Sequence, residues 1–516
     1  MERSSFVKYL PLRRIALVFG LLVLYTITST LLINHPSFRF IAKTNEANKI
    51  ADFCREWLRQ HRARSDWQAI IKPCYDNMAW GKVKDGWEIA NRTDASTSEI
   101  TFQDIRPAGE YSKIFIQSKT TDNRAKVIGG DTWRVNLRGP SSIAATVFDH
   151  NNGTYEALFL IMEPGIYELL IHLDYSLCDG FRDPPPDWFI KGNVHGKFQP
   201  RNLLGPLVDY LAQPFQSGTH LEITVETTDT IVSLADKLHS LESCSSTCNN
   251  LWDGFGRWKN DKWRPYLEES YDWSLPENYS SSGTLWVYGD SLGLMLFNSI
   301  RSRDLCTKLY SNCKNSYNWL YPTRNDKPVN NTRDNLDFRP EIVLNAIRSV
   351  LNTTDLQQPS SVLLLNLGLH YTRSVNFTTF QRVIGDVIDL LKEKTIDSQG
   401  KEVLKLKARV IWKSTTALCK HKQRYYNPTD KRFLTPQRVL LFSAYAITAM
   451  CQAGFDVIDV YPMTHSYPEG TLDNDIVHYP NKVFDAVVTL VENYKINNNQ
   501  RIETDDHERK IRRCAS

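Results

Sequence analysis

The sequence has 516 residues, 41% of them hydrophobic, so it is long enough for about two or three domains with sizeable cores, and disorder does not dominate it. Its 62 Lys and Arg residues nearly balance 58 Asp and Glu residues, which leaves a net charge of +4. A charge this small argues against nucleic acid as a partner.

Residues 15–33 (IALVFGLLVLYTITSTLLI) form an uncharged apolar run of 19 residues, close to what a helix needs to cross the hydrocarbon core of a membrane. Four basic residues precede it within residues 1–14, a flank that keeps this tail cytoplasmic and sends the rest of the chain to the lumen. We therefore expect an uncleaved type II signal anchor. A cleaved signal peptide is the alternative, but its apolar core usually has about 7–15 residues and a small-residue cleavage site follows it.

Two further features indicate the secretory pathway. The ten cysteines favour disulfides, because neither the Cys244/Cys248 pair nor the Cys306/Cys313 pair has a complementary His/Cys pair at zinc-like spacing; the connectivity stays open and no metal site is predicted. N-glycosylation sequons begin at Asn91, Asn152, Asn278, Asn330, Asn352 and Asn376.

The first lumenal domain is predicted from strand-like runs. Residues 34–95 are polar and mixed, as in a stem. From 96 to 225, short apolar runs alternate with turn signals such as IGGD, HNNGT and EPG, which is typical of an antiparallel β-sandwich. The runs are KIFIQS, WRVNLRG, SIAATVFD, YEALFLIM, GIYELLIHLDY and HLEITVETT. They contain no cluster of Ser, His and acidic residues, so we expect a binding or spacing module without catalytic groups.

Residues 226–275 are expected to form a linker. Its stretch CSSTCNNLWDGFGRWKNDKWRPY concentrates Trp252, Trp258 and Trp263 among basic residues. One interpretation is an aromatic surface that faces carbohydrate. The other is a segment that leads into the next domain and fills its edge with indole rings.

From residue 276 to 500, continuous apolar runs alternate with helical patterns, which predicts a parallel sheet covered by helices on both faces. Expected strands are TLWVY, SVLLLNLG, ARVIW and FDVIDV, and expected helices are SLGLMLFNSIRSR, FTTFQRVIGDVIDLLKEK, LTPQRVLLFSAYAITAMCQAG and KVFDAVVTLVENY. Thr435 and Pro436 are the expected N-cap and first-turn proline of the third helix, and Gly454 its C-terminal cap. Residues 501–516 form a charged tail.

The stretch WVYGDSLG places Ser291 just past an expected strand and at the start of an expected helix. Helix N-terminal amides have no intrahelical acceptors, so at this position they can stabilise an oxyanion that develops beside the serine. Sites in such sheets lie beyond the carboxyl ends of the strands. Ser291 is therefore a candidate nucleophile, although Gly, Asp and Ser are also ordinary turn residues.

A serine nucleophile needs a general base that a third group orients. In LDNDIVHYP, Asp475 and His478 are three residues apart in a loop at the same sheet edge, so the carboxylate can orient the imidazole; Asp473 is the second choice for that role. Asn366 directly follows another expected strand and is a candidate oxyanion-hole donor. Residues of these types at three strand ends of one domain predict an acyl-transfer site.

The GDS block at Ser291, the N-x-G block at Asn366 and the D-x-x-H block at Asp475 and His478 resemble the PC-esterase branch of the SGNH/GDSL hydrolase superfamily. The preceding segment is similar to filamin-like immunoglobulin domains, and together the two domains resemble the NXPE family (neurexophilin and PC-esterase domain proteins). The resemblance implies a catalytic triad of Ser291, Asp475 and His478, with Asn366 in the oxyanion hole. The superfamily's second oxyanion glycine has no evident counterpart in this sequence.

Relatives in this branch O-acetylate sialic acids in the Golgi and cell-wall polysaccharides in plants. The resemblance thus implies a Golgi type II membrane enzyme that transfers acetyl from acetyl-CoA, a co-substrate rather than a bound cofactor, to a sugar hydroxyl of a glycan or glycoprotein. The alternatives are a carbohydrate O-acetyl esterase and a non-catalytic, neurexophilin-like ligand-binding glycoprotein. Four cations have two interpretations: they contact an anionic sugar such as sialic acid, or they are simply solvated. These cations are Arg333, Arg339, Lys413 and Lys420.

Overall fold

The structure is a computed structural model. It describes residues 36–80, 87–185, 210–227, 251–266, 280–318, 338, 340–422 and 431–504. The chain divides into two compact units, one of residues 1–58 with 232–244 and the other of residues 59–231 with 245–516. Helix α2 (Pro36–Arg62) begins in the first unit and ends in the second, and all other described elements belong to the second unit.

The expected membrane anchor at residues 15–33 lies outside the described residues, as does the tail 1–14. Among the described helices, none combines the length and the apolar character that a membrane span requires.

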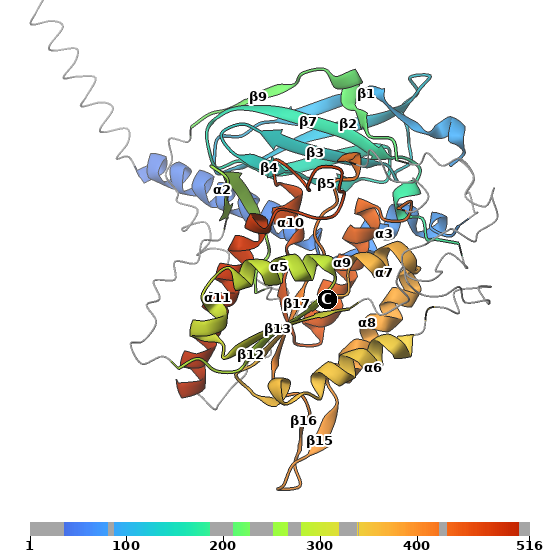
Figure 1. The fold of residues 1–516 in the computed structure, drawn as a ribbon. Helices are drawn as coiled ribbons and strands as arrows, with labels where there is room; N and C mark the ends of the chain where they lie inside the picture. The colour runs from blue at the N-terminus through green and yellow to red at the C-terminus, as the bar shows by residue number, and fades with distance from the viewer. Residues whose placement is uncertain are drawn as a thin grey trace, which may run out of the picture. The chain divides into compact units, whose positions relative to one another are not determined.

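Two antiparallel sheets form a β-sandwich, drawn in blue to green in Figure 1, as the alternating runs predict. One sheet has the order β1-β2-β6-β5, with bounds Thr93–Asp104, Tyr111–Thr120, Thr154–Leu160 and Thr146–Asp149. The seven-stranded sheet has the order β11-β10-β4-β3-β7-β8, with bounds Lys262–Pro265, Gly256–Lys259, Ser142–Ala144, Thr132–Arg138, Gly165–Tyr175 and Gln213–Pro214, and β9 (Glu222–Val225) pairs with β7.

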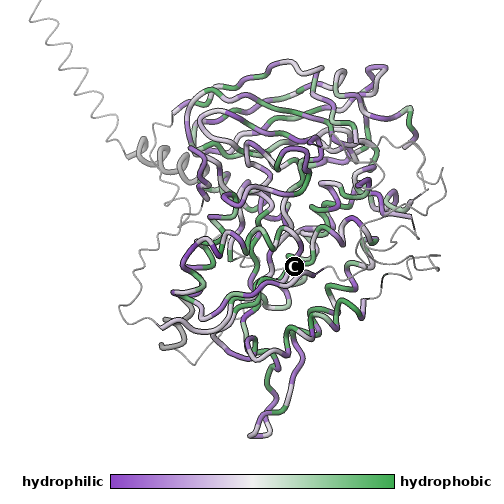
Figure 2. Tube along the Cα trace, in the orientation of Figure 1, coloured by the Kyte–Doolittle hydropathy of each residue, from purple (hydrophilic) through white to green (hydrophobic). Residues whose placement is uncertain are grey.

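The sandwich core follows from the two-residue period of its strands. In β2, Ile114 and Ile116 are fully buried, whereas Lys113 and Gln117 on the other face are half-buried. Trp133 in the opposite sheet donates from Nε1 to Ser118 Oγ at 3.0 Å, which satisfies the buried indole across the core. The same alternation of apolar and polar residues is visible along the strands in Figure 2.

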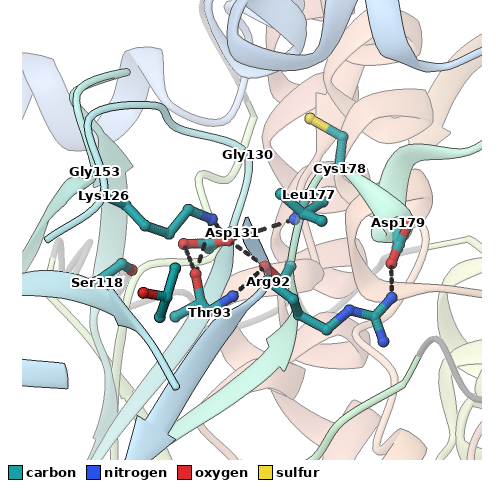
Figure 3. Close-up of polar contacts among 12 residues, drawn as sticks. Arg92, Thr93, Ser118, Lys126, Gly130, Asp131, Gly153, Leu177, Cys178 and Asp179 are labelled. Atoms are coloured by element: carbon teal, nitrogen blue, oxygen red, sulfur yellow. Dashed lines mark hydrogen bonds and ion pairs between the residues drawn. The ribbon is translucent and has the colours of Figure 1, made fainter. Parts of the chain in front are cut away.

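A buried ion pair lies at one end of the sandwich (Figure 3). Lys126 Nζ is 2.7 Å from Asp131 Oδ1, and both side chains are almost fully buried. Thr93 donates its hydroxyl to the other carboxylate oxygen at 2.6 Å, so the charges have the partners that burial requires. The disulfide between Cys74 and Cys178 joins the segment before the sandwich to the end of β7.

The β10–β11 hairpin adds two strands to the sandwich from the segment expected to be a linker. Trp258 of β10 pairs with Ser142 of β4. Its indole is 4% exposed, packs with the core of the following domain and donates from Nε1 to Met463 O at 2.9 Å. Trp263 is 8% exposed in the same core. These indoles therefore join the two domains rather than face solvent.

The second domain contains a five-stranded sheet in which every pairing is parallel, with the order β13-β12-β14-β17-β18. The bounds are Asn312–Tyr317, Thr284–Gly289, Val362–Leu365, Arg409–Lys413 and Asp456–Ile458. This confirms the predicted parallel sheet and adds β13, whose polar sequence NCKNSY gave no strand signal. The strand lies at the sheet edge, where such a sequence is tolerated.

Helices cover both faces of this sheet (Figure 1). Alternate strand residues separate the two layers: Leu363 and Leu365 pack with α6, α8 and α9, whereas Val362 and Leu364 pack with α5 and α11. Within the described residues, the α-helices that follow α2 are α3 (Trp67–Ile71), α5 (Ser291–Arg301), α6 (Pro340–Leu351), α7 (Leu369–Ser374), α8 (Phe377–Leu391), α9 (Pro436–Gln452), α10 (Tyr461–His465) and α11 (Asp485–Thr504).

Short helical turns and one hairpin complete the described elements. The turns are η1 (Lys72–Asn77), η2 (Ile89–Asn91), η3 (Asp179–Phe181), η4 (Phe215–Gly218), η5 (Leu305–Leu309), η7 (Thr354–Gln357), η8 (Lys420–Lys422) and η9 (Asn481–Phe484), and β15 (Lys394–Ile396) pairs with β16 (Glu402–Leu404). The caps predicted for α9 are present: Thr435 Oγ1 accepts from Arg438 N at 3.1 Å, Pro436 is in the first turn, and Gly454 follows the helix with φ +90°.

Candidate active site

Ser291 is the first residue of α5, directly after the turn that ends β12. Asp290 caps the helix, because its Oδ1 accepts from Leu292 N at 3.0 Å. The Ser291 side chain is half-buried at the carboxyl edge of the parallel sheet. This is the position that the sequence predicts for it.

His478 and Asp475 lie in the loop between α10 and η9. His478 Nε2 is 2.7 Å from Ser291 Oγ, and His478 Nδ1 is 2.6 Å from Asp475 Oδ2. The other carboxylate oxygen accepts from Val477 N at 2.8 Å and from His478 N at 3.2 Å, so the loop backbone fixes the carboxylate. The fold therefore connects the three side chains in one hydrogen-bonded line.

The charge on Asp475 determines the direction of these hydrogen bonds. Burial raises the pKa of its carboxyl, but the hydrogen bonds from the His478 ring and from the backbone of Val477 and His478 outweigh burial and hold this pKa at about 2. The carboxylate is ionised at neutral pH and can only accept. Nδ1 of His478 therefore carries the proton, and Nε2 is left to accept from the Ser291 hydroxyl.

Asp290 joins the serine turn to the neighbouring strand end. Its side chain is 1% exposed, and its Oδ2 accepts from Leu369 N at 3.2 Å, at the start of α7. Gly368 is required just before this point, because a Cβ there would lie 2.6 Å from Thr415 Oγ1 and 2.7 Å from Asn366 Oδ1. The glycine thus allows the turns after β14 and β17 to approach closely.

Asn366 follows β14 and is 3% exposed. Its Nδ2 donates to Lys413 O at 2.8 Å and lies 3.4 Å from Thr415 Oγ1, so in this state the amide binds the end of β17. The backbone carbonyl oxygen of Asn366 accepts a hydrogen bond from Asn318 Nδ2. The oxyanion role of Asn366 stays a prediction.

The other candidates for the site lie elsewhere. Asp473 is fully exposed, 3.8 Å from Lys422, and it is Asp475 that contacts His478. Lys413 and Lys420 are 1% and 6% exposed, so the interpretation of these two cations as a surface for an anionic sugar is wrong. Their ammonium groups donate to backbone carbonyl oxygens instead, Lys413 to Ser414 O and Lys420 to Lys431 O, among others. Arg333 and Arg339 lie outside the described residues.

Lys413 adds a buried charge near the site. Burial lowers the pKa of its ammonium to about 8, although the charges of Asp290 and Asp459 act in the opposite direction. Its Nζ donates to Ser414 O at 3.0 Å.

Four of the six expected glycosylation sequons fall on described residues. The side chains of Asn152 and Asn352 are exposed, and those of Asn91 and Asn376 are half-buried; Asn376 Oδ1 also caps α8 by accepting from Thr379 N at 2.8 Å. Asn278 and Asn330 lie outside the described residues. Glycosylation stays a prediction.

The described cysteines include two complete disulfides, which confirms the prediction that cysteines of this chain form disulfides. Cys306 and Cys313 form a disulfide, which replaces the alternative of a metal-ligand pair, and the Cys74–Cys178 bridge is the other. Cys451 is also disulfide-bonded, whereas Cys419 is a free thiol.

Two residues beside the serine turn were not predicted from the sequence. Tyr317 ends β13, opposite Gly289 of β12, and its hydroxyl is 2.8 Å from His370 Nε2 on α7. The position of His370, four residues after Asn366 at a strand end, is the signal that could have found it. The polar sequence of β13 offered no such signal for Tyr317.

The fold and site define an α/β domain with a Ser–His–Asp arrangement at its sheet edge, preceded by a β-sandwich. No family model and no curated relative matches the chain. Similar solved structures include the Lin-41 filamin domain, 12% identical over 27% of this chain and 99% of that chain, with a TM-score of 0.17. Another is the periplasmic domain of the lipopolysaccharide acetyltransferase of Salmonella ser. Paratyphi A, 14% identical over 42% of this chain and 84% of that chain, with a TM-score of 0.24. Scores this low carry no weight for function.

Proposed function

We propose that this protein is a glycan O-acetyltransferase of the NXPE family, anchored in the Golgi membrane by residues 15–33. It would transfer acetyl from acetyl-CoA to a sugar hydroxyl through an acetyl-Ser291 intermediate. The observation that carries the proposal is the line from Ser291 Oγ through the His478 ring to Asp475, with contacts of 2.7 and 2.6 Å. A hydroxyl, a base and an orienting carboxylate in this order are the parts that covalent acyl transfer needs.

The first half-reaction forms the acetyl-enzyme. His478 Nε2 takes the proton as Ser291 Oγ attacks the thioester carbonyl of acetyl-CoA. When the tetrahedral intermediate collapses, the C–S bond breaks and His478 gives the proton to the leaving thiolate, which departs as CoA thiol. The amide of Ser291 at the N-terminus of α5 is the expected first donor to the oxyanion, with Asn366 as the second.

The second half-reaction transfers the acetyl group. A sugar hydroxyl attacks the acetyl-Ser291 carbonyl while His478 Nε2 removes its proton, and the proton then returns to Ser291 Oγ as the ester bond to the enzyme breaks. The products are the O-acetylated sugar and the free enzyme. Asp475 stabilises the imidazolium that forms in each half-reaction.

Labelled acetyl-CoA and a panel of glycans test this proposal on the detergent-solubilised full chain. We expect label on the Ser291 peptide and on the sugar, both detected by mass spectrometry. Ser291→Ala should reduce transfer by about 10³-fold or more, because a triad acts as a unit. Asp473→Asn, on the same loop and fully exposed, is the matched control and should keep wild-type activity. Near-normal transfer by the Ser291 variant would exclude covalent catalysis at this site.

The same experiment separates the alternatives. Free acetate released at one rate whatever glycan is added, or rapid loss of acetyl from O-acetylated sugars, would favour an esterase that uses the same residues. Absence of any acetyl-enzyme with acetyl-CoA and with activated acetyl esters would favour a ligand-binding glycoprotein.

A further inference from the structure

The end of β13 lies directly beside the candidate nucleophile. Tyr317 is paired in register with Gly289, two residues before Ser291. The next residue, Asn318, donates its N–H to Gly289 O at 2.8 Å and is 0% exposed, so the backbone at Tyr317 is fixed relative to the serine turn. The backbone that carries Tyr317 is therefore held by the same turn that positions Ser291.

Tyr317 differs from the aromatic residues near it in the sheet. Its side chain is 43% exposed, whereas Trp286 and Tyr288 of the adjacent strand are 8% and 2% exposed. The hydroxyl is 2.8 Å from His370 Nε2, and the two rings meet edge to face with centroids 5.9 Å apart. An aromatic face thus stays accessible while its orientation is fixed by the histidine.

His370 connects this pair to the site from the other flanking strand. It is the second residue of α7, next to Leu369, whose N–H binds Asp290 Oδ2. Tyr317 and His370 therefore come from β13 and from the end of β14, which flank β12 on either side.

Both members of the pair are neutral at physiological pH. Burial lowers the pKa of His370 to about 4, with Arg373 and His478 acting in the same direction and Asp290 against it. Burial, helped by Asp290, raises the pKa of Tyr317 to about 12. Neither group is suited to act as a base or a nucleophile at neutral pH, but both can exchange hydrogen bonds with uncharged hydroxyls.

We propose that Tyr317 and His370 form the subsite for the acceptor sugar. The exposed ring of Tyr317 packs against the carbon face of the sugar ring, and the hydroxyl–imidazole pair binds a sugar hydroxyl, so that a neighbouring hydroxyl points at the acetyl-Ser291 carbonyl. This inference rests on the proposed function. It assigns Tyr317 a role in choosing between sugar and water, because an acyl-enzyme partitions according to what is held near its carbonyl.

The test measures that partition on the full chain. The acetyl donor is p-nitrophenyl acetate, and the acceptors are the methyl glycosides of galactose and of sialic acid. The burst of p-nitrophenol counts the acetyl-enzyme, and the ratio of acetylated sugar to free acetate reports the partition for each acetyl-enzyme formed. Tyr317→Ala should lower this ratio roughly 10-fold and raise the KM for the sugar, as expected when stacking and a hydrogen bond are lost.

Matched variants sharpen the result. Tyr317→Phe keeps the ring and should lower the ratio of acetylated sugar to free acetate only about 3-fold. If the alanine variant does not fold, the phenylalanine variant alone tests the role of Tyr317 in the subsite. Tyr75→Ala removes a tyrosine that is 71% exposed on η1 and should keep the wild-type ratio. Both sugars should respond, because the pair is neutral.

Three results would contradict either the acceptor subsite or the proposed function. A normal burst with a wild-type ratio in both Tyr317 variants would overturn the subsite and leave the proposed function standing. A fall confined to the anionic sugar would overturn the neutral subsite. No burst from the wild-type protein would overturn the proposed function and the subsite with it.

Discussion

His478 can accept the Ser291 proton only if its own proton is on Nδ1, and Asp475 selects that tautomer. The carboxylate accepts hydrogen bonds from His478 Nδ1–H and from two backbone N–H groups of its own loop. These donors favour the ionised form and outweigh the cost of partial burial, so the pKa of Asp475 is held at about 2. The orienting group is thus prepared by residues two and three positions along the chain.

This gives a prediction for stability against pH. Since the folded-state pKa of Asp475 lies below the ordinary 3.8, its ionised carboxylate stabilises the fold, by about 1–2 kcal/mol once solvent screening of this partly exposed group is taken into account. The contribution is present above pH ~4 and is lost as the pH falls through about 2. Urea unfolding should therefore show Asp475→Asn less stable than wild type at pH 6, with the difference narrowing between pH 4 and pH 2. Asp473→Asn should follow the wild type, and a pH-independent difference for Asp475→Asn would contradict the assignment.

At the scale of elements, the N-terminus of α5 and the start of α7 share one carboxylate. Asp290 accepts from Leu292 N with one oxygen and from Leu369 N with the other, at 3.0 and 3.2 Å. A residue that caps the helix carrying the serine therefore also fixes the distance to the strand end carrying Asn366. Helix start and site geometry depend on the same side chain.

Asp290→Ala should lower both stability and activity. Two buried N–H groups lose their acceptor, which costs about 1–3 kcal/mol in the free energy of unfolding, and Ser291 loses the cap that positions its turn. Asp66→Ala removes the N-cap of α3 and is the control, because its bond to Ala69 N is exposed and lies on another element. We expect the control to cost about 1 kcal/mol with full activity. Full activity in the Asp290 variant would show that the cap does not position the serine.

At the scale of the whole second unit, the sandwich and the segments before its strands make contacts just after β18 of the parallel sheet. The indole of Trp258 lies on a strand of the sandwich sheet and bonds to Met463 O, after β18. Arg64 binds Asp459 with two hydrogen bonds of 2.7 and 3.0 Å, also at the end of β18. Gly254 allows the segment before β10 to lie against the end of β18, because it has φ +68° and a Cβ there would lie 1.9 Å from Asp459 O.

Trp258→Ala should uncouple the domains. Truncating a buried tryptophan costs about 3–5 kcal/mol in the free energy of unfolding. Here the lost contacts lie at the junction of the two domains rather than within the core of one domain. We expect one thermal transition for the wild type and two for the variant. Circular dichroism during heating measures the transitions, and limited proteolysis shows which domain unfolds first. Phe102→Ala, which removes a ring 54% exposed on β1, should keep one transition. A single transition in the Trp258 variant would mean that other contacts couple the domains.

The proposed topology has its own test. If residues 15–33 are an uncleaved anchor with a cytoplasmic N-terminus, protease added to sealed microsomes should remove an N-terminal epitope tag and spare the C-terminal domain. Digestion of the C-terminal domain in intact vesicles would reverse the orientation.

The sequence by itself determined the two architectures and the three residues that meet at the sheet edge. Strand period, apolar strand length and caps such as Thr435 are local properties, and carboxyl ends of parallel strands converge by topology, so Ser291, Asp475 and His478 were expected together. Their catalytic role stays a prediction, but their meeting follows from the order of strands along the chain.

Only the tertiary structure decided which side chains face the site and which fill the core. From the sequence, Lys413 at a strand end was a candidate for an exposed cation, yet it is buried. Tyr317 lies in a polar run without a strand signal, yet its side chain is partly exposed next to the serine turn. The β10–β11 hairpin joins the sandwich through a pairing with β4, more than a hundred residues earlier in the chain. Local patterns cannot supply such information, because exposure depends on what packs against a residue and strand pairing depends on partners distant in sequence.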